Sequence, residues 1–251
     1  YARAILGLKR LDKLDEEPSA AWKGTVAHEI LRQWHDRKGS LVGIAGEVLD
    51  QENVHPVMRA LWLPRLLRGL AWVESEVARL EGREVVKWEE RGEMVVDGVR
   101  IHGRADRIDR LSDGTLAIVD YKTGKPPSAK KVQQGYSLQL GLVGMMAQRG
   151  GIDGVAGEPR QFEYWSLGKS DKSETGFGYR QEPILEGARK SGIPRDMFLS
   201  ETERYLREAI GKWIKGNEPF TARENPDLDV YADYDQLMRL EEWIGREEDG
   251  A

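Results

Sequence analysis

Apolar residues recur every three or four positions near the beginning of the chain, a spacing that predicts amphipathic helices. The first such segment covers residues 18–38, with Ser19 as a candidate N-cap. Its apolar face is formed by Trp22, Val26, Ile30 and Trp34. The second segment covers residues 56–81, where Pro64 can kink or split the helix. Two helical regions are therefore expected before residue 82.

The pattern then changes to runs of β-favouring residues separated by turn residues. The runs cover residues 84–90, 92–96, 99–110 and 115–122. Asp97-Gly98 and Asp113-Gly114 lie between runs, and Asp-Gly is a favoured dipeptide of tight hairpins. This region predicts a three-stranded antiparallel meander.

Helical and extended segments alternate after the meander. A helix is predicted from about residue 129 to 149, and residues 161–167 predict a strand. Because that strand returns after a helix, it can lie parallel to the last meander strand. Residues 168–180 are rich in Gly, Ser and charge and predict a flexible loop. Two further helices are predicted at residues 201–215 and 234–244. The order α…βββ-α-β predicts one α/β domain with accessory helices.

Composition narrows the class of protein. The chain has 251 residues, of which 39% are hydrophobic and 32% charged, which is typical of a globular protein with a real core. No apolar run approaches the roughly 18 residues of a membrane span, so we expect no membrane partner. The absence of cysteine excludes disulfides, a thiolate zinc site and a cysteine-held iron–sulfur cluster, and it is consistent with a cytoplasmic location. Because the chain begins at Tyr1, we expect it to be a piece of a longer polypeptide.

Charge is distributed unevenly. The formal net charge is −5, yet residues 100–131 hold eight Lys or Arg against four Asp. Within this window Asp120 and Lys122 are two positions apart in a strand, so their side chains share a face. A hairpin joins this strand to the one that carries Asp106, which brings both carboxylates to one sheet edge. Carboxylate oxygens favour Mg²⁺ or Mn²⁺, and a lysine beside them can stabilise phosphoryl charge or orient water.

A purely structural reading remains open for each of these residues. Asp120 and Lys122 can form an exposed pair at a strand end, and Asp106 can be balanced by Arg104 and Arg107 on a surface hairpin. However, the run that leads into Asp120 is mostly apolar, and an unpaired carboxylate there would be costly if buried. The metal-site interpretation is therefore favoured.

Two motifs in this region resemble the PD-(D/E)xK nuclease superfamily. They are Gly-Arg-Ala-Asp-Arg-Ile-Asp at residues 103–109 and Val-Asp-Tyr-Lys-Thr-Gly at residues 119–124. The RecB/AddB-type exonuclease domain of recombination helicase–nucleases is the most similar branch, since Gly24-x-x-x-His28 and Gln139-Leu140 match its upstream and downstream motifs. The ends of the chain resemble the alphaproteobacterial AddB version at residues 1–8 and 231–243.

The resemblance implies a fold and a metal site. The fold would be a restriction-endonuclease-like core, an α-βββ-α-β mixed sheet with accessory helices, in a single domain over residues 1–251 from the C-terminus of a larger helicase–nuclease subunit. Asp106, Asp120, His28 and the backbone carbonyl of Tyr121 would bind Mg²⁺, with Mn²⁺ as an alternative, and Lys122 would be the catalytic lysine. No iron–sulfur cluster is expected, because the four cysteines of many relatives are missing, so the C-terminal tail would dock by ordinary packing.

Several further residues carry weaker expectations. Gln139 would arrange the site or contact DNA, and position 143 is Val where the family often has Tyr. Contacts to DNA phosphates are predicted for Arg104, Lys125, Lys130 and Lys131, although a solvated helix start also explains the lysines. Glu89 or Glu90 can supply the acid found on the first strand of such nucleases, but a solvated strand end is favoured. Residues expected to be structural are His35, His102, Trp62, Trp72 and Trp165.

These patterns lead to one functional hypothesis and two alternatives. The hypothesis is a Mg²⁺-dependent DNA exonuclease domain that works in double-strand-break resection, with DNA and an AddA-like helicase–nuclease subunit as partners. The chain has no ATP site of its own, since Gly168-Lys169-Ser170 lacks the first glycine of a phosphate loop and has Glu163 there. The main alternative is a catalytically silent DNA-end-binding module, and a small-molecule phosphohydrolase is a weaker one.

Overall fold

The computed structural model describes residues 20–37, 39–52 and 56–219. The chain divides into two compact units after Glu208, and the sheet and the site described below belong to the larger one. Of the smaller unit the description covers residues 209–219, which include a π-helical turn at Ile210–Ile214. The predicted cap at Ser19, the helix at 234–244 and the AddB-like chain ends lie outside the described residues.

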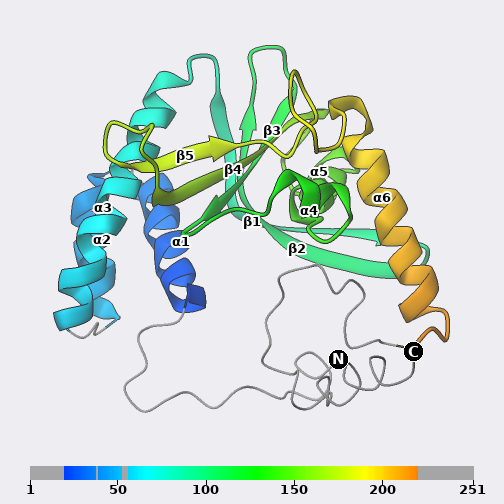
Figure 1. The fold of residues 1–251 in the computed structure, drawn as a ribbon, viewed down its shortest axis with the longest axis horizontal. Coiled ribbons are helices and arrows are strands. Elements are labelled where there is room, and N and C mark those ends of the chain that lie inside the picture. Colours follow the sequence, from blue (N-terminus) through cyan, green and yellow to red (C-terminus); the bar gives the residue numbers. More distant parts are fainter. Residues whose placement is uncertain (1–19, 38, 53–55, 220–251) are drawn as a thin grey trace, which may run out of the picture. The chain divides into compact units, whose positions relative to one another are not determined.

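A five-stranded mixed sheet forms the centre of the larger unit (Figure 1). Neighbouring strands are antiparallel, except that β3 and β4 are parallel, so the predicted α-βββ-α-β order is confirmed. The spatial order follows the sequence: β1 (Glu84–Val96), β2 (Val99–Arg110), β3 (Leu116–Lys122), β4 (Pro159–Lys169) and β5 (Phe177–Gln181).

The Asp-Gly dipeptides form the turns of the meander, as predicted. Asp97 and Gly98 have φ angles of 49° and 76°, the left-handed conformation that a two-residue hairpin turn requires at both positions. In the second turn, the Asp113 carboxylate accepts a hydrogen bond from the Thr115 amide at 2.9 Å. The register from Val96 opposite Val99 back to Trp88 opposite Arg107 is therefore set by the first turn.

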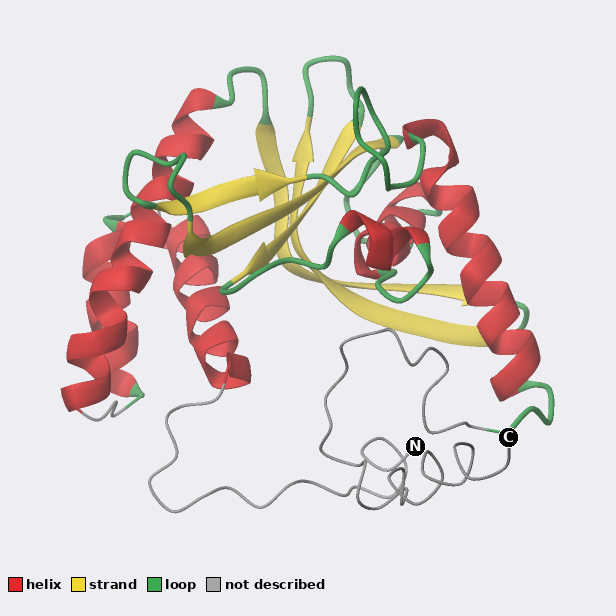
Figure 2. Cartoon of the chain, in the orientation of Figure 1, coloured by secondary structure: helices red, strands yellow, loops and turns green. Residues whose placement is uncertain are grey.

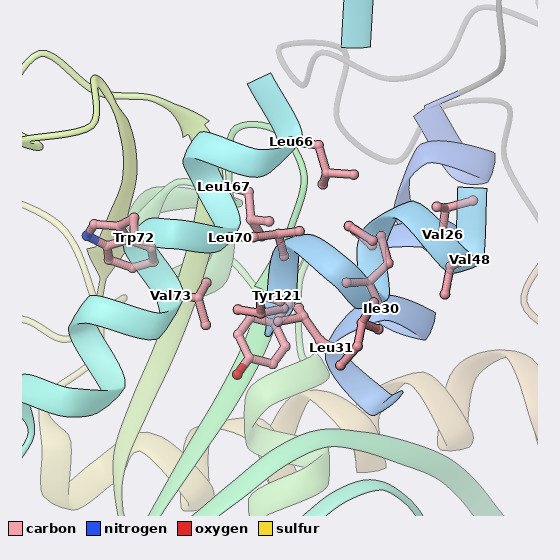
Figure 3. Packing of buried hydrophobic residues seen from close by; sticks show 14 of the residues in the cluster. Val26, Ile30, Leu31, Val48, Leu66, Leu70, Trp72, Val73, Tyr121 and Leu167 are labelled. Atoms are coloured by element: carbon pink, nitrogen blue, oxygen red, sulfur yellow. The ribbon is translucent and has the colours of Figure 1, made fainter. Parts of the chain in front are cut away.

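Helices cover both faces of the sheet (Figure 2). One face packs against α1 (Ala20–Arg37), α2 (Leu41–Gln51) and α3 (Pro56–Arg79), through Tyr121 and Leu167 of the sheet (Figure 3). The other face packs against α5 (Gln139–Gln148) and α6 (Phe198–Ala209), where the rings of Phe162 and Phe198 stack at 4.2 Å. Because β3 is covered on both sides, it reads as a continuous apolar run up to Asp120. None of the helices in the described ranges has the length and apolarity to cross a membrane.

The structure differs from the predicted elements in the helical hairpin before the sheet. Helix α2 was not predicted, although Ser40 caps it by accepting a hydrogen bond from the Gly43 amide. Helix α3 continues through Pro64. Pro64 and Ala60, whose carbonyl loses its helical partner, are both exposed, so water can satisfy that carbonyl. Buried Leu66 and Leu70 anchor the helix beyond the proline.

Two predictions after the meander are wrong. The helix expected over residues 129–149 is broken into α4 (Ala129–Gln133) and α5, because Gly135 adopts a φ of 82° and its backbone lies against the ring of Tyr205. The loop expected over 168–180 contains the end of β4 and the edge strand β5. Gly178 in β5, at a φ of 85°, has no room for a Cβ because Trp72 occupies that space.

Candidate functional site

Asp106 and Asp120 meet where β2 and β3 separate. The last ladder pair is Arg107 with Val119, and the two aspartates follow it on the same face of the sheet. Beyond that pair, the Asp106 Oδ2 accepts a hydrogen bond from the Tyr121 amide at 2.9 Å, in place of a ladder bond. Neither carboxylate oxygen of Asp120 is exposed or has a hydrogen-bond partner of good geometry. The sequence prediction that both carboxylates lie at one sheet edge is confirmed by these contacts.

His28 and Glu89 complete a cluster around Asp106. The Nδ1 of His28, from α1, lies 2.9 Å from Glu89 Oε1 and 3.7 Å from Asp106 Oδ1. One ligand atom from each of His28, Glu89 and Asp106 falls within 4.8 Å of the other two. Glu89 has a φ of 48°, a conformation that is unusual for a residue with a Cβ and that gathers at functional sites. We call His28, Glu89, Asp106 and Asp120 the acidic cluster.

Lys122 lies beside the acidic cluster and is held from two sides. Its Nζ is 2.6 Å from Asp120 Oδ2 and donates a hydrogen bond to Gln139 Oε1 at 3.0 Å. Gln139 is the first residue of α5, so the break in the predicted long helix places this amide opposite the strand that carries Lys122. The ammonium group therefore has a defined position between β3 and α5.

The carboxylates of the cluster lie close enough to shift the pKa values of their neighbours. Burial, and then the carboxylate of Asp120, raise the pKa of Asp106 to about 7. Burial also raises the pKa of Asp120, although Lys122 opposes the shift. Burial alone would lower the pKa of His28, but the hydrogen bond to Glu89 and the neighbouring carboxylates outweigh it and raise the pKa. Three largely buried carboxylates, together with one imidazole nitrogen, form a donor set that suits a divalent cation.

A cavity of about 670 Å³ opens in front of the cluster. It lies between α1 and the β1–β2 hairpin, and its lining includes His28, Glu89, Asp106 and Gln139. Arg104 lines the same cavity, with its Nε 3.2 Å from Glu89 Oε2. The volume is in the range of small-ligand sites and is large enough for one or two nucleotides.

Behind the cluster, a network of buried ion pairs supports the same strands. Arg107 binds both carboxylate oxygens of Asp109, at 2.6 and 2.7 Å, and donates to the Tyr121 hydroxyl at 3.2 Å. Arg83 reaches Glu163 at 2.6 Å and Asp109 at 3.4 Å. The side chain of Tyr121 thus points away from the acidic cluster, as the strand alternation predicts. We call Arg83, Arg107, Asp109 and Glu163 the buried ion-pair network.

The structure brings some predicted site residues to the cavity and leaves others outside it. His28, Asp106, Asp120, Lys122, Gln139 and Arg104 are in or beside the cavity. Lys125, Lys130 and Lys131 do not line it, and Lys125 and Lys130 are exposed. Trp72 and Trp165 are buried in the core, as expected, and Trp62 packs against Trp22. His35 lies between Trp34 and Trp88, and His102 is exposed on β2.

Glu89 lies in a different environment from the one that the sequence predicted. A solvated strand end was favoured for Glu89 and Glu90, and Glu90 is indeed partly exposed near Lys87. The Glu89 side chain, however, is only 10% exposed and contacts His28. The signal was present in the sequence, because counting outward from the Asp97-Gly98 turn pairs position 89 with Asp106.

Comparison with known proteins points to a nuclease family. A family profile described as the PD-(D/E)XK nuclease superfamily matches residues 1–229. An uncharacterised protein of Rickettsia conorii is 27% identical over 170 residues, which are 61% of this chain and 20% of that protein. The B subunit of the ATP-dependent helicase/deoxyribonuclease of Streptococcus equi subsp. zooepidemicus is 28% identical over 253 residues, 96% of this chain and 22% of the relative. Its counterpart of the same name in Streptococcus agalactiae is 28% identical over 153 residues, 56% of this chain and 14% of the relative. The chain thus matches only 14–22% of the length of these curated relatives.

Proposed function

Because the chain belongs to the PD-(D/E)XK nuclease superfamily, we propose that it is a divalent-metal-dependent DNA exonuclease domain of a complex that resects double-strand breaks. The observation that carries this proposal is the acidic cluster beside Lys122 in a cavity of nucleotide size. Three carboxylates at such close range favour a bound cation, and the ammonium group of Lys122 is placed to meet a phosphoryl oxygen.

His28, Asp106, Asp120 and the carbonyl of Tyr121 would hold the metal, and the position of Glu89 adds it to this set. Carboxylate and carbonyl oxygens suit both Mg²⁺ and Mn²⁺. When bound, such an ion lowers the pKa of a coordinated water and stabilises charge on the phosphoryl group. The structural reason for expecting it there is Asp120, whose buried oxygens accept no hydrogen bond of good geometry and lie beside the ammonium group of Lys122.

The side chains near the metal site have separate roles in phosphodiester hydrolysis. Water attacks the phosphorus and gives a proton to the solvent, while the bond from phosphorus to the leaving sugar oxygen breaks and that oxygen takes up a proton. Negative charge grows on the non-bridging oxygens during this step. Lys122, oriented by Asp120 and Gln139, stabilises that charge. In this scheme Gln139 acts on DNA mainly through Lys122, and Arg104 at the cavity neutralises an adjacent phosphate. Lys125, Lys130 and Lys131 stay predicted contacts to phosphates outside the cavity.

The relatives also support a larger assembly. The two streptococcal relatives are each named as the B subunit of an ATP-dependent helicase/deoxyribonuclease, a name that describes one part of a complex. We therefore propose that an AddA-like helicase–nuclease works beside this chain and delivers single strands from duplex ends. We also propose a cytoplasmic location, because the proposed substrate is chromosomal DNA.

A comparison of three proteins tests the proposed reaction. Linear single- and double-stranded DNA are incubated with the wild-type chain, Lys122→Ala, and Lys190→Ala, whose exposed lysine lies outside the cavity. We expect degradation in Mg²⁺ or Mn²⁺ but not in EDTA, a loss of about 10²–10³-fold in Lys122→Ala, and no change in Lys190→Ala. DNA binding without degradation in either metal would instead indicate a silent DNA-end-binding module.

A further inference from the structure

The β1–β2 hairpin extends well beyond the rest of the sheet (Figure 2). Strand β2 pairs with β3 only over Arg107–Arg110, whereas its pairing with β1 continues as far as Val99. At the tip, Arg207 of α6 forms an ion pair with Asp97 in the turn. The extended part of the hairpin is therefore fastened at its end, and its surface is preformed.

The two faces of this extension differ sharply. One face is buried and holds Gly92, Met94 and Val96. A Cβ at Gly92 would meet Ile152 and Met146, which pack against it. The opposite face is exposed, and its residues form three cross-strand pairs: Arg91 with Arg104, Glu93 with His102, and Val95 with Arg100. We call these six residues the hairpin face.

The hairpin face is basic although the chain as a whole is acidic. It has three arginines and a histidine against one glutamate, in a chain of net charge −5. Within the part of the chain that the structure describes, the side chains of Arg91 and His102 have no partner. Arg100 and Glu93 approach to 4.0 Å with both side chains mostly exposed, a pair worth little in water. The positive charge is thus available to an external anion.

The hairpin face is continuous with the candidate active site. Asp106, Arg104, His102 and Arg100 are successive same-face positions of β2, so they lie in one line at a spacing of about 6.8 Å. The first two line the cavity, and the last two lead away from it. The guanidinium groups of Arg104 and Arg100 on this line, with Arg91 opposite Arg104, can pair with successive phosphates of an extended strand. The imidazole of His102 offers a ring on which an unpaired base can stack, and the exposed Val95 beside it adds an apolar contact.

We propose that the hairpin face binds the single strand of DNA whose terminal nucleotides enter the cavity. The strip is one cross-strand pair wide along its whole length and ends at the cavity, so it matches the width of one backbone rather than two. This inference rests on the proposed function for the identity of the anion. The contact is electrostatic and independent of sequence, and it requires no metal.

Binding measured without cleavage tests the inference. Fluorescence anisotropy of a labelled 20-nucleotide single strand in EDTA compares the wild-type chain with Arg91→Ala/Arg100→Ala and with Lys172→Ala/Lys190→Ala, which removes the same charge from exposed positions elsewhere. We expect the Kd of the arginine variant to rise at least about tenfold at low salt, and the slope of log Kd against log salt to fall by about 1.4. The lysine variant should bind almost as the wild type does.

Each outcome separates this inference from the proposed function. If the wild type binds DNA and the arginine variant binds it equally well, or if neither binds, the inference is wrong whatever the nuclease assay shows. If the arginine variant binds weakly while the wild type cuts no DNA in any metal, binding by the hairpin face is supported and the proposed nuclease activity is contradicted. An equal loss for a blunt duplex would overturn the restriction to one strand. Urea midpoints of the variants should match the wild type, since all four replaced residues are exposed.

Discussion

The acidic cluster and the buried ion-pair network are built on the same strands, yet they treat charge in opposite ways. In the network every carboxylate faces a guanidinium group, and Arg83 holds the pKa of Glu163 below its usual value although burial would raise it. In the acidic cluster Glu89 lies beside His28 and the exposed guanidinium group of Arg104, and Asp120 lies beside Lys122. Asp106 has no guanidinium or ammonium partner within the described residues, and burial and the charge of Asp120 raise its pKa to about 7. Both sites are largely buried. The difference is that each carboxylate of the network pairs with a buried guanidinium group, whereas Asp106 has no such partner, which is why the proposed metal would bind in the acidic cluster.

The largest effect on stability is expected when the network loses a cation. Arg107→Met leaves Asp109 buried beside Arg83 alone, at 3.4 Å, and should lower the free energy of unfolding by about 3–5 kcal/mol. Urea unfolding in EDTA measures the change. Arg104→Met is the matched control, because its exposed guanidinium pairs with Glu89 and should matter by less than about 1 kcal/mol. Equal losses in the free energy of unfolding for the two variants would contradict the proposed difference between the buried network and the acidic cluster.

Two histidines of α1 should show the same contrast, because their pKa values are shifted in opposite directions. The carboxylates raise the pKa of His28, whereas burial and the charge of Arg107 lower that of His35 to about 4. At pH 5 the folded chain keeps His35 neutral while the unfolded chain protonates it. Stability is therefore lost as the pH falls from about 6.5 towards 4, by about 2 kcal/mol between pH 6.5 and 5.

NMR titration of the imidazole signals measures both histidines directly, and urea unfolding across this range measures the stability. His35→Phe retains an aromatic ring between Trp34 and Trp88 and should remove this part of the pH dependence. Two histidines that titrate together near 6.5 would contradict the assignment of opposite environments.

The smallest effect is expected when the acidic cluster loses a charge. Asp106→Asn relieves repulsion with Asp120 and should raise the free energy of unfolding in EDTA by about 1 kcal/mol. Asp109→Asn in the network should instead lower it, because it breaks a bidentate pair. Added Mn²⁺ should stabilise the wild type and Asp109→Asn but not Asp106→Asn, as thermal unfolding would show. Stabilisation of Asp106→Asn by the metal would place the ion elsewhere.

Local sequence was sufficient for the meander and for the principal carboxylates. Two Asp-Gly turns set the register of β1 to β3, and strand alternation then puts Asp106 and Asp120 on one face and Arg107 and Tyr121 on the other. The parallel pairing of β3 with β4 follows from the intervening helix. These features depend on contacts between residues close in sequence or on connection rules, so a pattern is enough to predict them.

Long-range packing decided the rest. Strand β5 forms in a stretch of turn-like composition because Gly178 packs under Trp72, more than 100 residues earlier in the chain. Gly135 breaks a helix because Tyr205 lies against it, and the break delivers Gln139 to Lys122. His28 reaches Glu89 only because α1 packs beside β1. Such contacts join segments far apart in the sequence, and their energies come from packing and burial that no local pattern encodes.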